Sequence, residues 1–353
     1  MRFFLIFALL VAAILFACAE RWSVEKAQVW QKKRGYKAGS NFVPSTADNE
    51  LEMFQDITWD PTTIDRELQW AQDAGFTTMR VFLHNILWDQ GSDAFLNRLD
   101  EYLTIADKHG ISTMLVLFDS CWNIVAKPGV QPEPIPGVHN SQWVQAPGNG
   151  VVYDSDAFQT LKPYVQGVVS RFKDDSRVLA WDVWNEPDNS GYSGDLIGPL
   201  LQNVFDWVRE VNPSQPLTTP VWYGFSDWNT FQRIQMDNSD VISFHHYDNE
   251  NALQDVISSL QDYAQGRPLI CTEYMARTAG SHFEPHLQIM KDAGIYAINW
   301  GLVSGRTQTI YPWSTTTVPA TEEPEIWFHD IFRNTGTAFN QSEISYIQSV
   351  LKK

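Results

Sequence analysis

The stretch VLAWDVWNEP at residues 178–187 indicates the fold more clearly than any other part of the chain. It begins as a short and almost continuously apolar run, which is typical of a strand covered on both faces of a parallel sheet. The run then ends in the polar residues Asn185 and Glu186, followed by Pro187. Seven further runs, rich in Val, Ile, Thr and aromatic residues, occur at residues 38–42, 76–84, 111–119, 217–223, 241–247, 268–274 and 295–302.

Amphipathic helical patterns separate these runs. Pro61 opens one helix in its first turn, where proline is tolerated, and Gly75 closes it. Eight strands that alternate with helices favour an α/β fold, a single-domain (β/α)8 TIM barrel, over an open doubly wound sheet. No Gly-x-Gly-x-x-Gly turn follows any run, which also disfavours the open sheet. The other helical patterns cover residues 96–110, 158–173, 195–211, 227–236, 252–264 and 282–293.

The chain continues beyond the eighth run through residues 324–333 to a last predicted helix at residues 341–352. Asn340 and Glu343 have the spacing of a capping box, in which each side chain bonds the backbone at the other position. We therefore expect Asn340 to begin this helix.

Composition excludes several classes of protein. The 353 residues are 44% hydrophobic, which is enough for a large core and excludes intrinsic disorder. The formal net charge is −17, so the surface would repel nucleic acid and acidic lipid. We expect no nucleic-acid partner and no membrane contact beyond a possible lipid anchor, and we expect a monomer.

The first 19 residues are typical of an export signal. Arg2 precedes an unbroken apolar run of fifteen residues from Phe3 to Ala17, shorter than the roughly 20 that span a membrane. Ala17-Cys18-Ala19 fits a signal-peptidase site, which predicts a mature domain at residues 20–353. A lipoprotein signal with Cys18 as the lipidated residue is the alternative, and an uncleaved anchor is a third. The chain is therefore expected to be exported: periplasmic, secreted or lipid-anchored at a bacterial cell surface.

Polar residues gather where the predicted strands end, and barrel enzymes carry their chemistry at that end. Two isolated carboxylates, Glu186 and Glu273, end runs four and seven and would face each other across the barrel. A carboxylate beside apolar residues is costly unless it is used or paired, so the competing interpretation is a structural pair with an arginine. The other polar or aromatic residues at these ends are Asn41, Arg80, His84, Asp119, Asn185, His245, Tyr247 and Trp300.

Two carboxyl groups that face each other across a pocket can cleave a glycosidic bond. One must be protonated, to donate to the leaving oxygen, while the other is ionised and attacks the sugar or activates water. This pairing makes a glycosidase the first functional hypothesis for Glu186 and Glu273.

The sequence Trp184-Asn185-Glu186-Pro187 resembles the Asn-Glu-Pro signature of the retaining glycoside hydrolases of clan A, most closely family 5, the cellulase and mannanase family. Arg80 and Glu273 fit that family's pattern, in order and on the expected strands. The resemblance implies that Glu186 is the acid/base and Glu273 the nucleophile of a double displacement on β-linked polysaccharide or oligosaccharide. It implies no metal and no organic cofactor.

The same resemblance implies roles for further residues. Asn185 would bond the sugar 2-hydroxyl, and Arg80 and Tyr247 would contact the nucleophile. His245 would orient the acid/base or the sugar, and Trp300 would lie under the sugar ring. Asn41 and Trp122 complete the predicted substrate-binding residues, together with Asp119.

The third run departs from the family pattern. It ends Phe118-Asp119-Ser120-Cys121-Trp122, whereas the family usually has a histidine there. Asp119 could either bind substrate or cap the loop, and the sequence leaves both interpretations open.

The long connection at residues 122–156 is predicted to form a wall or lid of the site, since structureless loops of this length are usually functional. Sugars stack on aromatic rings, and five tryptophans follow strand ends and are candidates for this role, whereas Trp22, Trp30 and Trp70 lie in helical patterns and are expected in the core. The five candidates are Trp88, Trp122, Trp143, Trp222 and Trp313.

Cysteines and histidines give further expectations. Cys121 and Cys271 would lie on nearly opposite strands, too far apart for a disulfide, and are predicted to be free and buried. His245 and His246 are adjacent on a strand and point to opposite faces, so they are not expected to share a metal ion.

Two other functional classes stay open: a non-catalytic carbohydrate-binding relic of the fold, and a metal-dependent barrel enzyme. Among hydrolases we expect an endo-acting β-mannanase or β-glucanase. The sequence does not decide between mannose, glucose, xylose and galactose, nor between endo and exo action.

Overall fold

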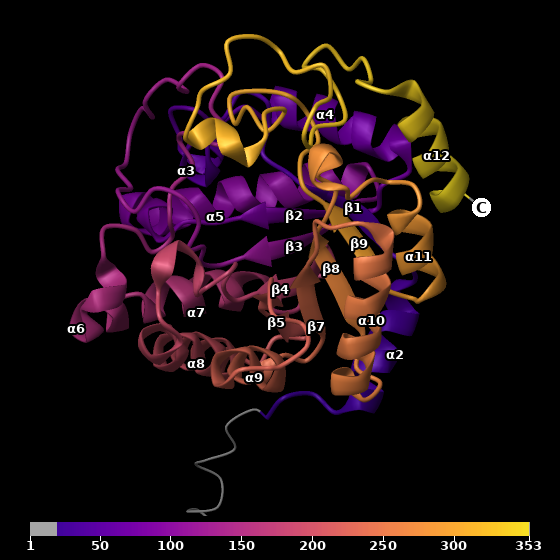
Figure 1. Cartoon of the computed structure of the whole chain (residues 1–353). Helices are drawn as coiled ribbons and strands as arrows, with labels where there is room; N and C mark the ends of the chain where they lie inside the picture. The colour runs from indigo at the N-terminus through magenta and orange to yellow at the C-terminus, as the bar shows by residue number, and fades with distance from the viewer. Residues whose placement is uncertain (1–19, 353) are drawn as a thin grey trace, which may run out of the picture.

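The computed structural model describes residues 20–352 and shows a parallel β-barrel surrounded by helices (Figure 1). Each neighbouring pair of strands is parallel, as predicted for a (β/α)8 barrel. The strands are β1 (Ala38–Asn41), β2 (Thr78–Phe82), β3 (Ser112–Val116), β4 (Val178–Asp182), β5 (Leu217–Thr218), β6 (Pro220–Val221), β7 (Ile242–His245), β8 (Leu269–Glu273) and β9 (Tyr296–Asn299).

The fifth predicted run forms two strands, which is why eight runs give nine strands in the described residues. Leu217 and Thr218 of β5 pair with β4, whereas Pro220 and Val221 of β6 pair with β7. Pro220 lacks the amide hydrogen that would continue the first ladder. The two ends of the sheet are thus two halves of one run, so the sheet closes on itself.

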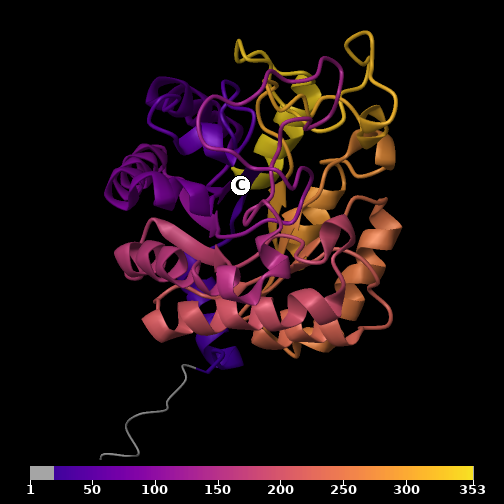
Figure 2. The same cartoon turned by 90° about the vertical axis from the view of Figure 1, so that its left-hand side faces the viewer.

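Helices lie around the outside of the barrel, and Figure 2 shows them encircling the strands. Loops of residues 117–150 and 300–340 cross the face at which the strands end. The helices are α2 (Val24–Arg34), α3 (Glu50–Phe54), α4 (Pro61–Ala74), α5 (Asn85–Lys108), α6 (Ser155–Gln159), α7 (Lys162–Phe172), α8 (Gly194–Val211), α9 (Thr230–Asn238), α10 (Glu250–Ala264), α11 (His286–Asp292) and α12 (Gln341–Leu351).

Two helices differ from the sequence prediction for identifiable reasons. Helix α5 begins well before residue 96, because His84 Nδ1 accepts a bond from the Ile86 amide and caps the helix. The chain then kinks at Gly91, whose φ of 156° suits glycine. The pattern at residues 158–173 is divided between α6 and α7.

Helix α2 and the residues just before it close the end of the barrel opposite the carboxyl ends of the strands. Trp22 and Trp30 pack with barrel residues such as Met114 and Ile298, and both tryptophans are buried, as predicted. Trp70, also expected in the core, is partly buried against it.

The last helix, α12, follows the prediction, but neither bond of the expected capping box forms. The Asn340 side chain accepts a bond of 3.0 Å from the Ser342 amide and caps the helix. Glu343 does not return to the cap. Instead it accepts two bonds from the buried Arg277, at 2.9 and 2.7 Å, because this cation needs a partner.

The predicted export signal at residues 1–19 lies outside the described residues. Across residues 20–352, no helix combines the length and the apolarity that crossing a bilayer requires.

Glu67 on α4 is a fully buried carboxyl that ties this helix to the loop after β1. It accepts bonds from the Ser45 amide, at 3.0 Å, and from the Ser45 hydroxyl. Burial is the largest influence on the pKa of Glu67 and raises it to about 7, although the bonds from Ser45 lower it. Because the unfolded chain ionises this acid at a lower pH, folding is disfavoured progressively as the pH rises towards 7.

We therefore predict that Glu67→Gln stabilises the protein relative to the natural chain as the pH rises from about 4.5 to about 7. Glutamine does not titrate, so the variant avoids a linkage cost that reaches about 3 kcal/mol at the top of this window. The measurement is the difference in Tm between the two proteins across that range. Any pH-independent cost of placing the glutamine amide beside Ser45 changes the Tm difference by the same amount at every pH.

The exposed Glu325 provides the control, since Glu325→Gln removes a carboxylate without touching a buried contact. A Tm difference for Glu67→Gln that does not change with pH would contradict the assignment.

Candidate active site

A pocket of about 450 Å³ lies at the carboxyl ends of the barrel strands. Eight predicted site residues line it, whereas Asn41 and Arg80 lie buried beneath it and are not among its lining residues. The lining residues are Asp119, Cys121, Trp122, His139, Asn140, Trp143, Asn185, Glu186, Asn189, Ser190, Trp222, His245, Tyr247, Glu273, Trp300, Trp313 and His329.

Glu186 follows β4 in a conformation that residues other than glycine rarely adopt, with φ of 40°. Two backbone hydrogen bonds hold this turn. The backbone N–H of Asn189 donates to the Glu186 carbonyl at 2.9 Å, and the backbone N–H of Asn185 donates to the Phe118 carbonyl at 2.7 Å. Side chains then fix the carboxyl group. Its Oε1 lies 2.6 Å from His245 Nδ1, and its Oε2 accepts bonds from Asn189 Nδ2, at 2.5 Å, and from the Cys121 thiol, at 3.3 Å.

Burial is the largest influence on the pKa of Glu186 and raises it, while the bonds from Asn189 and Cys121 lower it. A carboxyl group with a raised pKa keeps its proton at a pH where an exposed glutamate has lost it. Glu186 can therefore act as a proton donor at a higher pH than an exposed glutamate.

Glu273 ends β8 on the other side of the pocket. Its Oε1 accepts a bond of 3.1 Å from Arg80, and its Oε2 accepts a bond of 2.7 Å from the Tyr247 hydroxyl. Burial and the nearby Glu186 raise the pKa of Glu273, whereas His245, Arg80 and Tyr247 lower it. Because Arg80 contacts Glu273 directly, we infer that Glu273 ionises first when the pair loses a proton.

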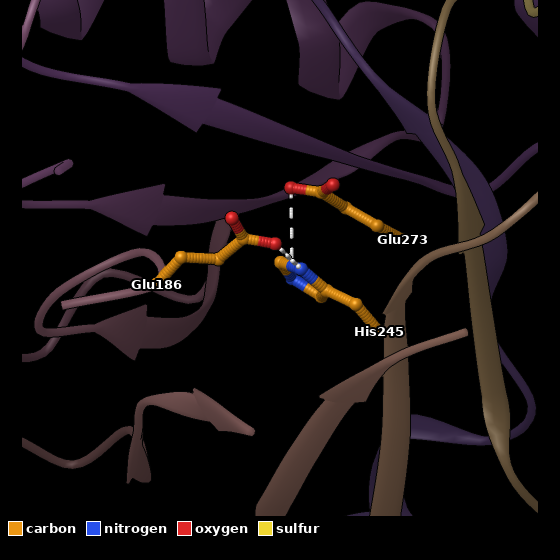
Figure 3. A group of neighbouring side chains, drawn as sticks. All are labelled: Glu186, His245 and Glu273. Atoms are coloured by element: carbon orange, nitrogen blue, oxygen red, sulfur yellow. Dashed lines mark hydrogen bonds and ion pairs between the residues drawn. The ribbon is translucent and has the colours of Figure 1, made fainter. Parts of the chain in front are cut away.

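Figure 3 shows the two carboxyl groups approaching each other from opposite sides, with the His245 ring beside both. One oxygen of each glutamate and one nitrogen of His245 lie within 4.8 Å of one another. His245 Nε2 lies 3.5 Å from Glu273 Oε1. Burial lowers the pKa of His245 to about 3, so the ring is neutral. A single bond of a bound molecule could thus be reached by both carboxyl groups.

Arg80 joins the strands beneath the pocket. Besides Glu273, it donates to Asp182 Oδ2 from Nε at 3.0 Å and from Nη2 at 2.7 Å. It also donates to Asn41 Oδ1, at 2.8 Å, and to Asn185 Oδ1, at 2.6 Å. The predicted contact of Arg80 with Glu273 is therefore present, while its position below the pocket makes it a support for other side chains.

Asp119 stands where the family usually has a histidine. Its Oδ1 accepts bonds from Asn185 Nδ2, at 2.9 Å, and from the Cys121 amide, at 3.0 Å. Its Oδ2 accepts a bond of 2.6 Å from Trp143 Nε1. These protein donors favour the structural interpretation, in which Asp119 orients Asn185 and Trp143.

Four of the five candidate tryptophans line the pocket, as does Trp300. Trp88 instead packs against Tyr164, with ring centroids 6.5 Å apart, so its predicted place at the site is wrong. The helix formed from residue 85 onward carries it away from the rim. The Trp300 ring is held by Phe82 and Trp143, each with centroids 5.7 Å away.

Cys121 and Cys271 are free, as predicted. Cys271 is buried, but Cys121 is only partly buried, because it follows the strand and reaches the pocket beside Glu186.

Sequence reasoning missed six lining residues: Cys121, which was predicted to be buried, and His139, Asn140, Asn189, Ser190 and His329. Asn189 offered a signal, since it lies three residues after Glu186 in the turn that Pro187 begins. His139 and Asn140 lie inside the long connection, and His329 lies beyond the last barrel strand, where strand-end reasoning does not look.

A parallel barrel with two carboxyl groups facing each other at its carboxyl end suits the cleavage of glycosidic bonds. Residues 38–305 match the family described as Cellulase (glycosyl hydrolase family 5). The match covers most of the chain, so this chain belongs to glycosyl hydrolase family 5, which its motifs resembled.

Curated relatives of this chain include mannan endo-1,4-beta-mannosidases. A probable mannan endo-1,4-beta-mannosidase F from Aspergillus flavus is 23% identical over 221 residues, which cover 56% of this chain and 44% of that relative. This chain thus matches less than half the length of that curated relative.

Two solved structures are similar in fold. Exo-beta-1,4-mannosidase Op5Man5 from Opitutaceae bacterium strain TAV5 has a TM-score of 0.61 at 15% identity, over 89% of this chain and 59% of that one. The beta-1,4-mannanase of the sea hare Aplysia kurodai has a TM-score of 0.55 at 18% identity, over 75% and 87%. At these identities the likeness shows the fold.

We predict that Asn189→Ala moves the alkaline limb of the kcat/KM pH profile to higher pH. In the natural chain, the Asn189 side-chain amide bonds Glu186 Oε2 at 2.5 Å and thereby lowers the pKa of this carboxyl group. The variant removes this amide. Glu186 would then keep its proton to higher pH. The measurement is hydrolysis of a β-glycan across the pH range.

Ser190→Ala is the matched control, because Ser190 also lines the pocket but bonds the Ser120 carbonyl instead of Glu186. An alkaline limb that stays in place or moves to lower pH in Asn189→Ala would contradict the proposed influence on Glu186.

Proposed function

We propose that this protein is a retaining glycoside hydrolase that cleaves β-linked glycans by double displacement, with Glu186 as acid/base and Glu273 as nucleophile. The observation that carries the proposal is the approach of the two carboxyl groups, whose nearest oxygens lie within 4.8 Å. Retaining enzymes have carboxyl groups about 5–5.5 Å apart, whereas inverting enzymes need about 6.5–9.5 Å to admit a water molecule. The observed approach supports retention.

In the first step, a Glu273 oxygen bonds the anomeric carbon as the glycosidic carbon–oxygen bond breaks. The proton of Glu186 passes to the leaving oxygen. In the second step, the ionised Glu186 takes a proton from water, whose oxygen bonds the anomeric carbon and releases Glu273. Each step inverts the anomeric carbon, so the product keeps the β configuration.

The surrounding side chains have supporting roles in this proposal. Asn185, held between Arg80 and Asp119, is placed to bond the sugar 2-hydroxyl, a contact that strengthens in the transition state. Trp300 provides an aromatic face for the sugar ring. His245 holds Glu186, and the Tyr247 hydroxyl holds Glu273.

We propose an endo-acting enzyme on β-mannan as the first choice of substrate, with β-glucan as the alternative. The mannanase names of the similar proteins support mannan. The name of another similar structure is an exo-mannosidase, so the mode of action needs its own measurement. Product analysis on β-mannan, β-glucan, xylan and galactan tests both points.

We further propose that the mature catalytic domain at residues 20–353 acts as a monomer outside the cytoplasm. The signal-like residues 1–19 support export, by cleavage after Ala19 or by lipid attachment at Cys18. Mass analysis of the mature amino terminus separates the two.

Two alternatives lead to different outcomes. A binding relic of the fold would bind glycans without turnover. A metal-dependent enzyme would use Glu186, His245 and Glu273 as ligands, since one atom of each lies within 4.8 Å of the others. Arg80 already supplies positive charge to Glu273, which opposes a second cation there. We expect full activity after treatment with EDTA, and loss of activity that returns with added metal would favour the metal enzyme.

We predict that Glu186→Gln lowers activity on β-mannan by about 10²–10⁴-fold, the usual contribution of general acid–base catalysis. Glutamine keeps the size of the side chain but has no proton to donate. Glycosides with very good leaving groups should lose less in the first step. Steady-state kinetics on both substrate types measure this, and natural-chain activity in Glu186→Gln would refute the assignment.

We also predict that Glu273→Ala abolishes turnover, because the covalent step is lost. Added azide should restore cleavage of an activated β-glycoside and give an α-glycosyl azide. NMR of the first-formed sugar supplies the stereochemical test in the natural enzyme. A first product of α configuration from a β-linked substrate would exclude double displacement.

A further inference from the structure

One wall of the pocket is built by two segments far apart in the sequence. His139 and Asn140 come from the long connection after β3, and Trp313 and His329 come from the segment after β9. Backbone and side-chain bonds join the two segments. The Asn140 amide bonds the Thr307 carbonyl at 2.9 Å, and the His139 amide bonds Thr315 Oγ1 at 3.0 Å.

Both histidines of this wall have a defined orientation. Nδ1 of His139 lies 2.7 Å from the Tyr311 carbonyl, and Nδ1 of His329 lies 2.7 Å from the Met275 carbonyl. A carbonyl only accepts, so each Nδ1 carries the proton. Burial lowers the pKa of His139 to about 4 and lowers that of His329 well below its usual range, so both rings are neutral. Each Nε2 is therefore a hydrogen-bond acceptor.

The Nε2 atoms of His139 and His329 make no hydrogen bond to the described residues. Both rings are at least 98% buried and line the pocket, yet neither Nε2 has a hydrogen-bond partner in residues 20–352. Neither atom is fully enclosed, so a bound molecule in the pocket can reach it. Asn140 also lines the pocket, but its amide nitrogen and oxygen are fully enclosed and have no partner among the same residues.

Aromatic rings frame these groups and connect them to the catalytic pair. Trp122 lies 5.5 Å from the His139 ring, and Trp313 lies 5.9 Å from the His329 ring. The Tyr247 ring lies 5.6 Å from His329, and its hydroxyl bonds Glu273. Tyr247 therefore places this wall directly beside the proposed catalytic pair.

The chemistry of the lining restricts what this wall can bind. Two acceptor nitrogens suit two hydroxyl groups, and flanking indole rings suit the flat face of a sugar. No lysine or arginine is among the described residues that line the pocket. A carboxylate-bearing sugar would therefore find no cation here and would meet Glu186 and Glu273 instead.

We propose that His139 and His329 form a further sugar-binding subsite, which takes an adjacent neutral hexose of the glycan chain. Two hydroxyls of that hexose donate to the Nε2 atoms of His139 and His329. Trp122 and Trp313 flank its ring. This inference rests on the proposed function and assigns the residues that select a chain of neutral hexoses over single glycosides and over uronic-acid glycans.

The test compares His139→Asn and His329→Asn with the natural enzyme on β-1,4-mannotetraose and on 4-nitrophenyl β-D-mannopyranoside. Asparagine has an amide group near the position of Nδ1 but lacks Nε2. We expect each variant to lower kcat/KM for the tetrasaccharide about three- to tenfold, mainly through KM, as the loss of one hydrogen bond implies. The loss of kcat/KM for the aryl glycoside, which has no second sugar, should be smaller than the loss for the tetrasaccharide.

The exposed His282, which is not among the pocket residues, provides the control as His282→Asn. A merely structural role of His139 or His329 would lower Tm and reduce kcat/KM for both substrates equally, which overturns the subsite. Unchanged kinetics of both variants on the tetrasaccharide overturn it too. A natural enzyme that cleaves neither compound would count against the proposed action on mannan itself, whatever the variants do.

Discussion

The buried guanidinium of Arg80 is the interaction on which the rest of the site depends. It has no solvent exposure, and its removal from water is costly unless anions and acceptors surround it. Asp182 on β4 and Glu273 on β8 supply the charges, and Asn41 and Asn185 supply neutral acceptors. One cation thus connects strands on several sides of the barrel. Its position also decides which of the two facing glutamates is stabilised as an anion.

From Arg80 a continuous series of contacts leads to the walls of the pocket. Arg80 bonds Asn185, whose amide bonds Asp119, and Asp119 in turn accepts the bond from the Trp143 indole. Trp143 then packs edge-on against Trp300. Asp119 therefore has a clear physical role at the position where the family usually has histidine. Asp119 links Asn185, which Arg80 holds, to Trp143 in the long connection. The pocket wall that Trp143 forms and the proposed catalytic pair are therefore positioned together.

One wall of the pocket comes from long connecting segments outside the barrel strands. The similar structures share the barrel at 15–18% identity, and their names include an exo-mannosidase and a mannanase. Two long segments meet here, where the Ala320 amide bonds the Gly137 carbonyl at 2.9 Å. They bring neutral imidazoles, an asparagine and indoles to a pocket that also contains two acids. Such a lining fits neutral sugars and excludes acidic ones, which is a restriction that the barrel alone does not impose.

The amino-acid sequence by itself determined the barrel and the two glutamates at its strand ends. Apolar runs such as residues 178–185 depend on local pattern, and a carboxylate at the end of such a run stands out because burial is costly. The tertiary structure alone decided the division of the fifth run at Thr219, the missing capping bond of Glu343, and the place of Trp88 away from the pocket.

It also decided the approach of Glu186 to Glu273 and the wall containing His139, Asn140 and His329. These features come from contacts between segments more than 80 residues apart, such as that of His139 with Tyr311. Local periodicity carries no information about such pairings, because the residues meet only once the barrel has closed and both loops have packed against each other.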